Sequence, residues 1–111
     1  MNRQVKSGEF ARVKLDLHGA FIRRTNLTGA NLSFANLESA DCRGADFSNA
    51  NLTGANFSGA NLSGAILRGA NFKDAKLTGA DLRGADLLGV KNLTPAQLSE
   101  TLHDDAVDLA G

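Results

Sequence analysis

The sequence of 111 residues contains no Trp or Tyr, one Cys, one Pro and two His. One Cys cannot form an intramolecular disulfide, so a disulfide-stapled secreted domain is excluded and a reducing compartment is expected. The sequence also lacks a run of about 18 apolar residues, and residues 1–9 lack the apolar core of a signal peptide. We therefore expect a soluble, cytoplasmic protein that does not contact a membrane.

The sequence also lacks a charge of one sign. Twelve Lys and Arg balance twelve Asp and Glu, which gives a formal net charge of zero. A nucleic-acid-binding protein usually carries a basic surface, so direct nucleic-acid binding is not expected. Ala, Leu, Gly and Asn fill about half of the chain, and few side chains remain that could perform catalysis. We predict that the protein is not an enzyme and has no catalytic, cofactor-binding or metal-binding residues.

The sequence instead contains a five-residue repeat. From Leu15 to Gly89 it divides into fifteen consecutive pentads, and the middle residue of each is apolar. The first residue is Ala in all pentads except those that begin with Leu15 and Thr25. The middle residues, which we predict to form the core, are Leu17, Ile22, Leu27, Leu32, Leu37, Cys42, Phe47, Leu52, Phe57, Leu62, Leu67, Phe72, Leu77, Leu82 and Leu87.

A period of five fits neither the 3.6-residue period of a helix nor the two-residue period of a strand. Most pentads end in Gly, and most have Asn or Asp before the middle residue. Both features favour turns, because Gly admits positive φ and Asn or Asp tolerates left-handed geometry. If each pentad forms one side and one corner, four pentads close a square coil in which the middle residue and the preceding Ala point inward.

The order Ala, Asn or Asp, Leu or Phe, and two variable residues resembles the pentapeptide-repeat family. The matching pentads cover about two thirds of the chain, for example 50–54, 55–59 and 60–64. The resemblance implies an all-β solenoid, a right-handed quadrilateral β-helix. Fifteen pentads make about four coils, and a strand spacing of roughly 4.8 Å gives a height on the order of 18 Å.

Twenty residues per coil predict which side chains stack above one another. Cys42 falls in an inward column, so we interpret it as a small apolar core residue rather than a nucleophile. Asn31, Asn51 and Asn71 fall in one outward column, and we expect them to form a ladder of hydrogen bonds between coils. His18 and His103 fall at opposite ends of the stack, so a shared metal or acid–base site is not expected.

Both ends of the repeat change in character. We expect residues 1–14 to form an N-terminal arm or irregular first coil, 15–89 the β-helix, and 90–111 a helical cap with a tail. Thr94, Pro95 and Gln97 have the spacing of a capping box with Pro at the first helical position, which predicts a short α-helix at about 95–103. Leu98 and Leu102 would share one face of it. This helix would cover the open end of the coil, and the alternative is that it forms a dimer contact.

Four outward positions that are otherwise polar or Gly carry large apolar residues: Phe21, Phe34, Ile66 and Leu88. Ile66 and Leu88 fall on one side in neighbouring coils beside Arg68, and this group could contact a partner or a second copy in a homodimer. We treat these five residues as the candidate interface. The alternative is that the terminal helix covers Leu88 and the N-terminal arm covers Phe21.

With this resemblance, we expect a bacterial protein that acts as a non-enzymatic scaffold for protein–protein interaction, whose partner the sequence does not identify. Some members of the family inhibit DNA gyrase by mimicking DNA, and a DNA-mimicking modulator of gyrase or topoisomerase is the alternative. A DNA mimic requires a dense array of negative charge. The pentads at 15–89 contain seven acidic and seven basic residues, so the scaffold is preferred.

Overall fold

The computed structural model describes residues 15–104, and the arm predicted at 1–14 and the tail at 105–111 lie outside the described residues. Each pentad forms a short extended side followed by a tight turn. In the turn after Phe57, the N–H of Ala60 donates to the carbonyl of Phe57 at 2.9 Å. Gly59, the third residue of that turn, has φ of +67°, as a type II turn requires. The repeated Gly therefore allows the chain to turn after every five residues.

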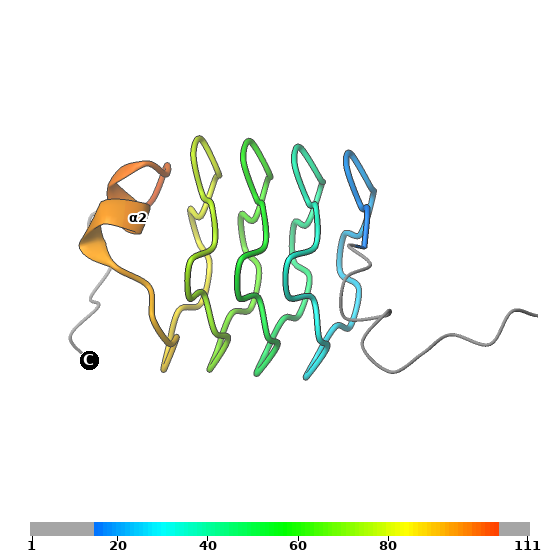
Figure 1. Ribbon diagram of the computed structural model, residues 1–111, viewed down its shortest axis with the longest axis horizontal. Coiled ribbons are helices and arrows are strands. Elements are labelled where there is room, and N and C mark those ends of the chain that lie inside the picture. Colours follow the sequence, from blue (N-terminus) through cyan, green and yellow to red (C-terminus); the bar gives the residue numbers. More distant parts are fainter. Residues whose placement is uncertain (1–14, 105–111) are drawn as a thin grey trace, which may run out of the picture.

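The extended side of each pentad pairs in parallel with the corresponding side of the next coil. Bridges join residues twenty positions apart, from Asp16 with Asn36 at one end to Asn71 with Lys91 at the other. Because each pentad pairs with the pentad four pentads later, one coil consists of four pentads and has four sides. Figure 1 shows the coils stacked along the long axis of the molecule, with α2 at the C-terminal end.

Every backbone N–H of the inner pentad 55–59 has a hydrogen-bond acceptor. The Ala55 N–H closes the preceding turn on the carbonyl of Leu52 at 3.0 Å. Three further N–H groups donate to the adjacent coils, namely Asn56 to the Ala35 carbonyl (2.9 Å), Phe57 to Lys76 (2.7 Å) and Gly59 to Thr78 (2.9 Å). The fifth, that of Ser58, donates to the side-chain Oδ1 of Asn56 at 3.0 Å. The Asn therefore serves the one N–H that neither the turn nor the stack can satisfy.

The expected Asn ladder between coils is wrong for Asn31 and Asn51, whose side chains bond within their own pentads. Their Oδ1 atoms accept from the N–H groups of Ser33 and Thr53 at 3.2 and 3.1 Å. Such local Asx turns compete effectively with longer-range partners because the acceptor is only two residues away. Only Asn71, at the end of this column, also contacts another coil, where it accepts from Asn92 Nδ2 at 2.9 Å.

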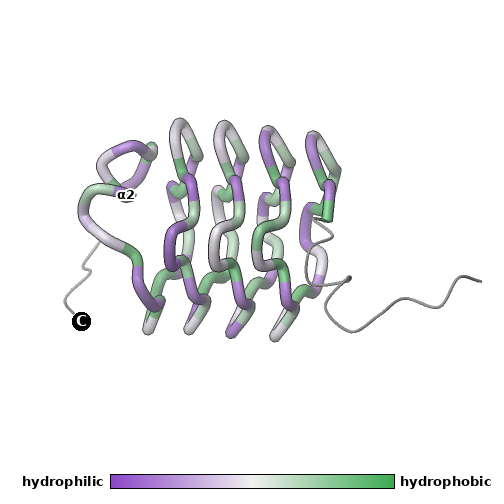
Figure 2. The backbone as a smooth tube through the Cα atoms, viewed as in Figure 1, coloured by the Kyte–Doolittle hydropathy of each residue, from purple (hydrophilic) through white to green (hydrophobic). Residues whose placement is uncertain are grey.

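The core is a column of apolar side chains inside the coils. The middle residues from Leu32 to Leu82 are buried, and so are the Ala residues that begin these pentads from Ala35 to Ala80. Three aromatic rings pack near its centre: Phe57 lies 6.0 Å from both Phe47 and Phe72 between ring centroids. In Figure 2 apolar and polar segments alternate along each coil, as expected for side chains that point alternately in and out.

The middle residues of the end coils are less buried than those of the inner coils. Leu17, Ile22, Leu27 and Leu87 are only half-buried, and they pack against the buried cluster on one side. A coil at the end of the stack has a neighbour on one side only, which explains the difference.

The helix α2 (Pro95–Ser99) packs on the last coil. Thr94 is its N-cap, and the capping box is formed: the Gln97 N–H donates to Thr94 Oγ1 at 3.1 Å and Gln97 Oε1 accepts from the Thr94 N–H at 2.8 Å. The Gln97 Nε2 also donates to the carbonyls of Phe72 and Ala75 at 2.9 Å. Leu98 is buried against the core.

The helix is shorter than the predicted range of 95–103. After Glu100 the chain returns to the coil, where the Leu102 N–H donates to the Ala80 carbonyl at 2.9 Å and Leu82 donates to Leu102 at 2.7 Å. Extending the helix would leave those edge groups of the last coil without these partners. Leu102 is consequently exposed and does not share a buried helix face with Leu98.

Between residues 15 and 104, no helix has the length and apolar character needed to cross a lipid bilayer.

Substitution of Asn56 tests the role of the Asx side chain. Asn56→Ala removes the acceptor of the Ser58 N–H, and we expect the free energy of unfolding to fall by about 1 kcal/mol. Asn56→Asp keeps the oxygen and should cost less. Urea unfolding of the three proteins measures the difference, and equal losses in both variants would contradict the Asx role.

Gly54 tests the close approach of neighbouring coils. A Cβ at Gly54 would lie 2.5 Å from the ring of Phe34, whereas a Cβ at Gly64 would meet no atom within 4 Å. Both glycines have positive φ, so Gly64→Ala should cost about 1–2 kcal/mol from backbone strain alone. Gly54→Ala should cost more, because the ring must also move. In thermal melts, adding Phe34→Ala, which removes the ring but keeps a Cβ at this positive-φ position, should remove the excess of Gly54→Ala, and no recovery would contradict this explanation.

Candidate interaction surface

The coil presents four sides, and we name each after its first inward residue: the Leu17, Ile22, Leu27 and Leu32 sides. Every side displays the residue before the inward one, the residue after it and the corner residue. Because the backbone and the inward side chains are used by the fold, these outward positions are where the pentads differ from one another. A binding site on this part of the chain must be built from them.

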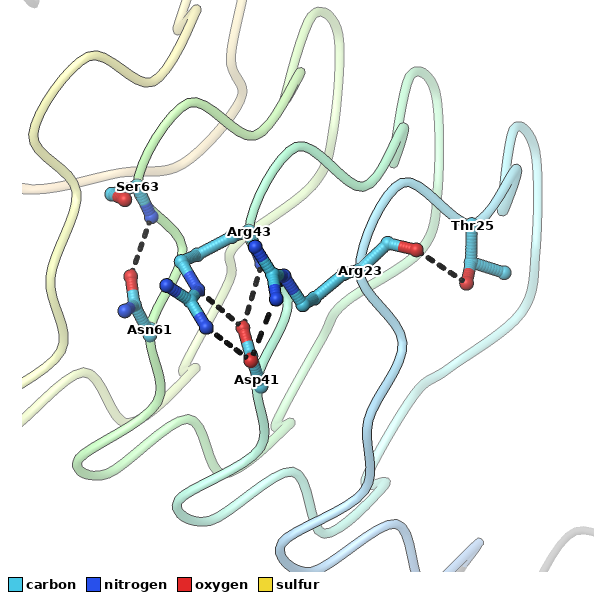
Figure 3. A network of polar contacts seen from close by, with 6 residues as sticks. All are labelled: Arg23, Thr25, Asp41, Arg43, Asn61 and Ser63. Carbon is cyan, nitrogen blue, oxygen red and sulfur yellow. Dashed lines mark hydrogen bonds and ion pairs between the residues drawn. The ribbon is translucent and has the colours of Figure 1, made fainter.

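The Ile22 side carries a network of ion pairs, shown in Figure 3. Arg43 donates to both carboxylate oxygens of Asp41, from Nε at 2.9 Å and from Nη2 at 2.7 Å. Arg23, from the preceding coil, places its Nε 3.9 Å from the same carboxylate. The hydrogen bonds from Arg43 are the main reason that the pKa of Asp41 is lowered to about 2. The carboxylate is therefore ionised at neutral pH and already occupied by guanidinium groups.

The same motif recurs two coils later on the Ile22 side. Arg83 donates to Asp81 from Nε at 3.0 Å and from Nη2 at 2.9 Å, and these bonds lower the pKa of Asp81. From 21 to 84 this side carries four arginines and two aspartates, a net charge of +2. It has the highest positive charge of the four sides.

On the Leu27 side, the structure places Ile66, Arg68 and Leu88 near one another but not as a continuous apolar patch. Ile66 bridges Asp46 and Asp86 and is half-buried, while Leu88 is 63% exposed. Arg68 Nε donates to Asp86 Oδ2 at 2.5 Å. In the stack Asp86 follows Ile66 in one column and Leu88 follows Arg68 in the next, so this ion pair crosses the diagonal between the two apolar residues.

The other two candidate interface residues lie elsewhere, and the structure does not bring all five together. Phe21 begins the outward column of the Ile22 side and is 87% exposed. Phe34 stands at a corner of the Leu32 side, with its ring over Gly54. The spacing of twenty residues between Phe34 and Gly54 is a signal that could have predicted this contact. Phe34 therefore fills the space left by a glycine in the next coil.

The alternative in which the terminal helix covers Leu88 is wrong. Gln97 of α2 bonds to Phe72 and Ala75, and Glu100 accepts from the Thr78 hydroxyl at 2.6 Å, all outside the pentad of Leu88. The helix is held there because it continues the pairing of the preceding sides. The cover predicted for Phe21 falls on residues 1–14, which lie outside the described residues.

The side chains with potential chemistry lie apart. Cys42 is fully buried, and burial is the main cause that raises the pKa of its thiol to about 12. His18 lies 3.6 Å from Glu38, whereas His103 contacts Thr101 at the other end of the stack. Among residues 15–104, no three His, Cys, Asp or Glu side chains converge as a metal ion would require.

Comparison with known proteins gives one family. The family model described as "Pentapeptide repeats" matches residues 30–69, 55–91 and 65–102. Together these ranges span about two thirds of the chain, the part that carries the regular pentads. No curated protein matches the sequence.

Several solved structures are similar. A pentapeptide repeat protein from the thylakoid lumen of Arabidopsis thaliana is 29% identical over 70% of this chain and 58% of its own, with a TM-score of 0.43. HetL from the cyanobacterium Nostoc, involved in the regulation of heterocyst differentiation, is 28% identical over 78% and 46%, with a TM-score of 0.34. QnrB1, a plasmid-mediated fluoroquinolone resistance protein, is 26% identical over 68% and 37%, with a TM-score of 0.46. The chain thus spans about half the length of these proteins.

The Asp41–Arg43 pair predicts how stability depends on pH. The pKa of Asp41 in the folded protein, about 2, lies below its ordinary value of 3.8. The stabilisation from this group is therefore complete above about pH 4 and is lost as the pH falls toward 2. We expect a carboxyl titration followed by NMR to have its midpoint near 2, and Arg43→Ser to raise it. Arg83→Ser is the control and should leave it unchanged; an unshifted midpoint in Arg43→Ser would refute the assignment.

Proposed function

The chain belongs to the pentapeptide-repeat family, and we propose that it is a non-enzymatic scaffold that presents flat sides to a partner protein. One observation carries the proposal: the outward residue that follows the inward one varies from pentad to pentad, and its side chain is not needed to build the coil. The backbone hydrogen bonds of the pentad 55–59 do not use the side chain of Ser58, which stands after the inward Phe57. The side chain at this position can therefore change without loss of the fold, as a binding surface requires.

We also propose the finer architecture that the family implies. The coil of 15–89 is a right-handed quadrilateral β-helix, and 90–111 form its cap and tail, with the cytoplasm as its compartment. The four-sided pairing at a spacing of twenty residues and the burial of Leu93 and Leu98 support this architecture.

The charge pattern speaks against the alternative of a DNA-mimicking modulator of gyrase. DNA presents one negative charge for roughly every 1.7 Å of its axis. Here three of the seven acidic residues at 15–89 are paired with arginines within the same side: Asp41 with Arg43, Asp81 with Arg83 and Asp86 with Arg68. Such pairs form an alternating surface rather than a uniformly negative one.

Four matched variants test the scaffold. Glu38→Lys, Arg43→Glu, Ser48→Glu and Thr53→Glu change the same repeat position in one coil, one on each side. Because this position is variable, all four proteins should fold. We expect proteins captured from the source cells, quantified by mass spectrometry, to be lost with the variant of one side or of two adjacent sides. Identical capture by all four variants and the unchanged protein would contradict a side-specific scaffold.

A supercoiling assay with purified gyrase separates the alternative. The scaffold predicts no inhibition by the unchanged protein. Inhibition at micromolar concentration would favour the DNA mimic, and Arg83→Glu, which lowers the net charge of the Ile22 side from +2 to zero, should then inhibit more strongly.

A further inference from the structure

The first coil departs from the repeat at two positions on the Ile22 side. Phe21 stands where most pentads have Asn or Asp, so the Arg23 N–H has no Asx oxygen two residues before it. Arg24 stands where most pentads have Gly, and its φ is +55°, a left-handed conformation that is unfavourable for a side chain of this size. Both departures cost the coil stability.

Burial in the core does not offset the cost of either departure. Phe21 is 87% exposed, the highest value among the large apolar side chains of residues 15–104, and Arg24 is exposed as well. Phe34 provides a contrast to Phe21, because its ring covers Gly54 in the next coil, and the aliphatic stem of Arg24 likewise lies close to Gly44. Local violations of the rules that stabilise a fold are expected where a residue is kept for function.

The arginines around Phe21 exceed the acids that neutralise them. The first two coils of this side hold three arginines, Arg23, Arg24 and Arg43, and one acidic residue, Asp41. Arg43 occupies both oxygens of Asp41, and the 3.9 Å separation leaves Arg23 without a hydrogen bond to it. The side chain of Arg23 is more than half exposed. The side thus offers guanidinium donors beside an exposed aromatic ring.

We propose that Phe21, Arg23, Arg24 and Arg43, here named the first-coil patch, bind an acidic segment of a partner protein whose apolar side chain packs on Phe21. This inference rests on the proposed scaffold function and names the side and the partner chemistry. Guanidinium groups bind carboxylates with the forked geometry that Arg43 already shows with Asp41. Exposed aromatic and Arg side chains are also enriched where proteins bind one another.

A protein segment fits the patch better than a nucleic acid. Binding to a phosphate backbone draws its affinity from the neutralisation of many phosphates. The three arginines of the patch together with Asp41 have a net charge of +2, and the whole chain has a net charge of zero. A segment with a few spaced carboxylates can place them on Arg23 and Arg24 and avoid Asp41.

A fluorescein-labelled peptide with six Glu around a central Phe is the probe, measured by fluorescence anisotropy at low salt. The double variant Phe21→Asn/Arg24→Gly restores the usual repeat residues. We expect it to bind the peptide at least about tenfold more weakly, while its thermal midpoint rises by roughly 2–6 °C because the Asx bond and the Gly turn are regained. This rise excludes loss of folding as the cause.

Arg23→Ser and Arg83→Ser form a matched pair that locates the site. Both remove one positive charge from the same column of the Ile22 side, which already holds Ser63, but Arg83 lies three coils from Arg23. Arg23→Ser should weaken binding several-fold, and Arg83→Ser should change it less than about twofold. Equal effects of the two variants would show that general charge attraction, not the patch, holds the peptide.

Three other results would overturn the proposal: no binding of the Glu peptide at about 1 mM, equal binding of a control peptide with Gln in place of Glu, or tighter binding of a single-stranded DNA of similar charge. The capture panel distinguishes this failure from that of the scaffold. If capture depends on a side other than the Ile22 side, the scaffold proposal is supported and the first-coil patch proposal is contradicted. If capture depends on no side, both proposals are contradicted.

Discussion

Stacking of each coil on the next through backbone hydrogen bonds is the constraint on which the rest of the structure depends. In the pentad 55–59, three N–H groups donate to adjacent coils, one closes a turn and one is taken by the side chain of Asn56. This arrangement explains why most pentads have Gly at the corner and Asn or Asp before the inward residue. It also keeps successive coils in register, so that side chains twenty residues apart lie above one another.

The same constraint shapes the surface. Outward side chains have neighbours two residues away in the same pentad and about twenty residues away in the next coil, and charged groups pair at both distances. Asp41 pairs with Arg43 within a pentad, and Asp86 pairs with Arg68 between coils. These pairs place opposite charges next to one another on the Ile22 and Leu27 sides. On the Ile22 side, Arg24 stands in place of the usual Gly and adds to the excess of positive charge, in the same pentad as the exposed Phe21.

The ends of the stack show what happens where a neighbouring coil is missing. At the C-terminal end, Gln97 takes over part of the pairing by donating to two coil carbonyls, and Leu102 continues it through the backbone. The C-terminal end of the short helix is therefore set by the backbone pairing of Leu102 with the last coil rather than by the helix's own sequence pattern. At the other end the inward Leu17 and Ile22 are only half-buried.

The sequence by itself determined the pentad boundaries, the inward columns and the start of the helix at Thr94, because turn residues, apolar period and capping box are local signals. Only the tertiary structure decided contacts between coils. Examples are the ion pair between Arg68 and Asp86, which crosses the diagonal from Ile66 to Leu88, and the end of the helix at Ser99. The structure likewise decided that the side chains of Asn31 and Asn51 accept from the backbone N–H two residues later, rather than bonding to an Asn in the next coil, because the local donor is nearer. These outcomes depend on distances between residues about twenty positions apart, which a five-residue pattern does not encode.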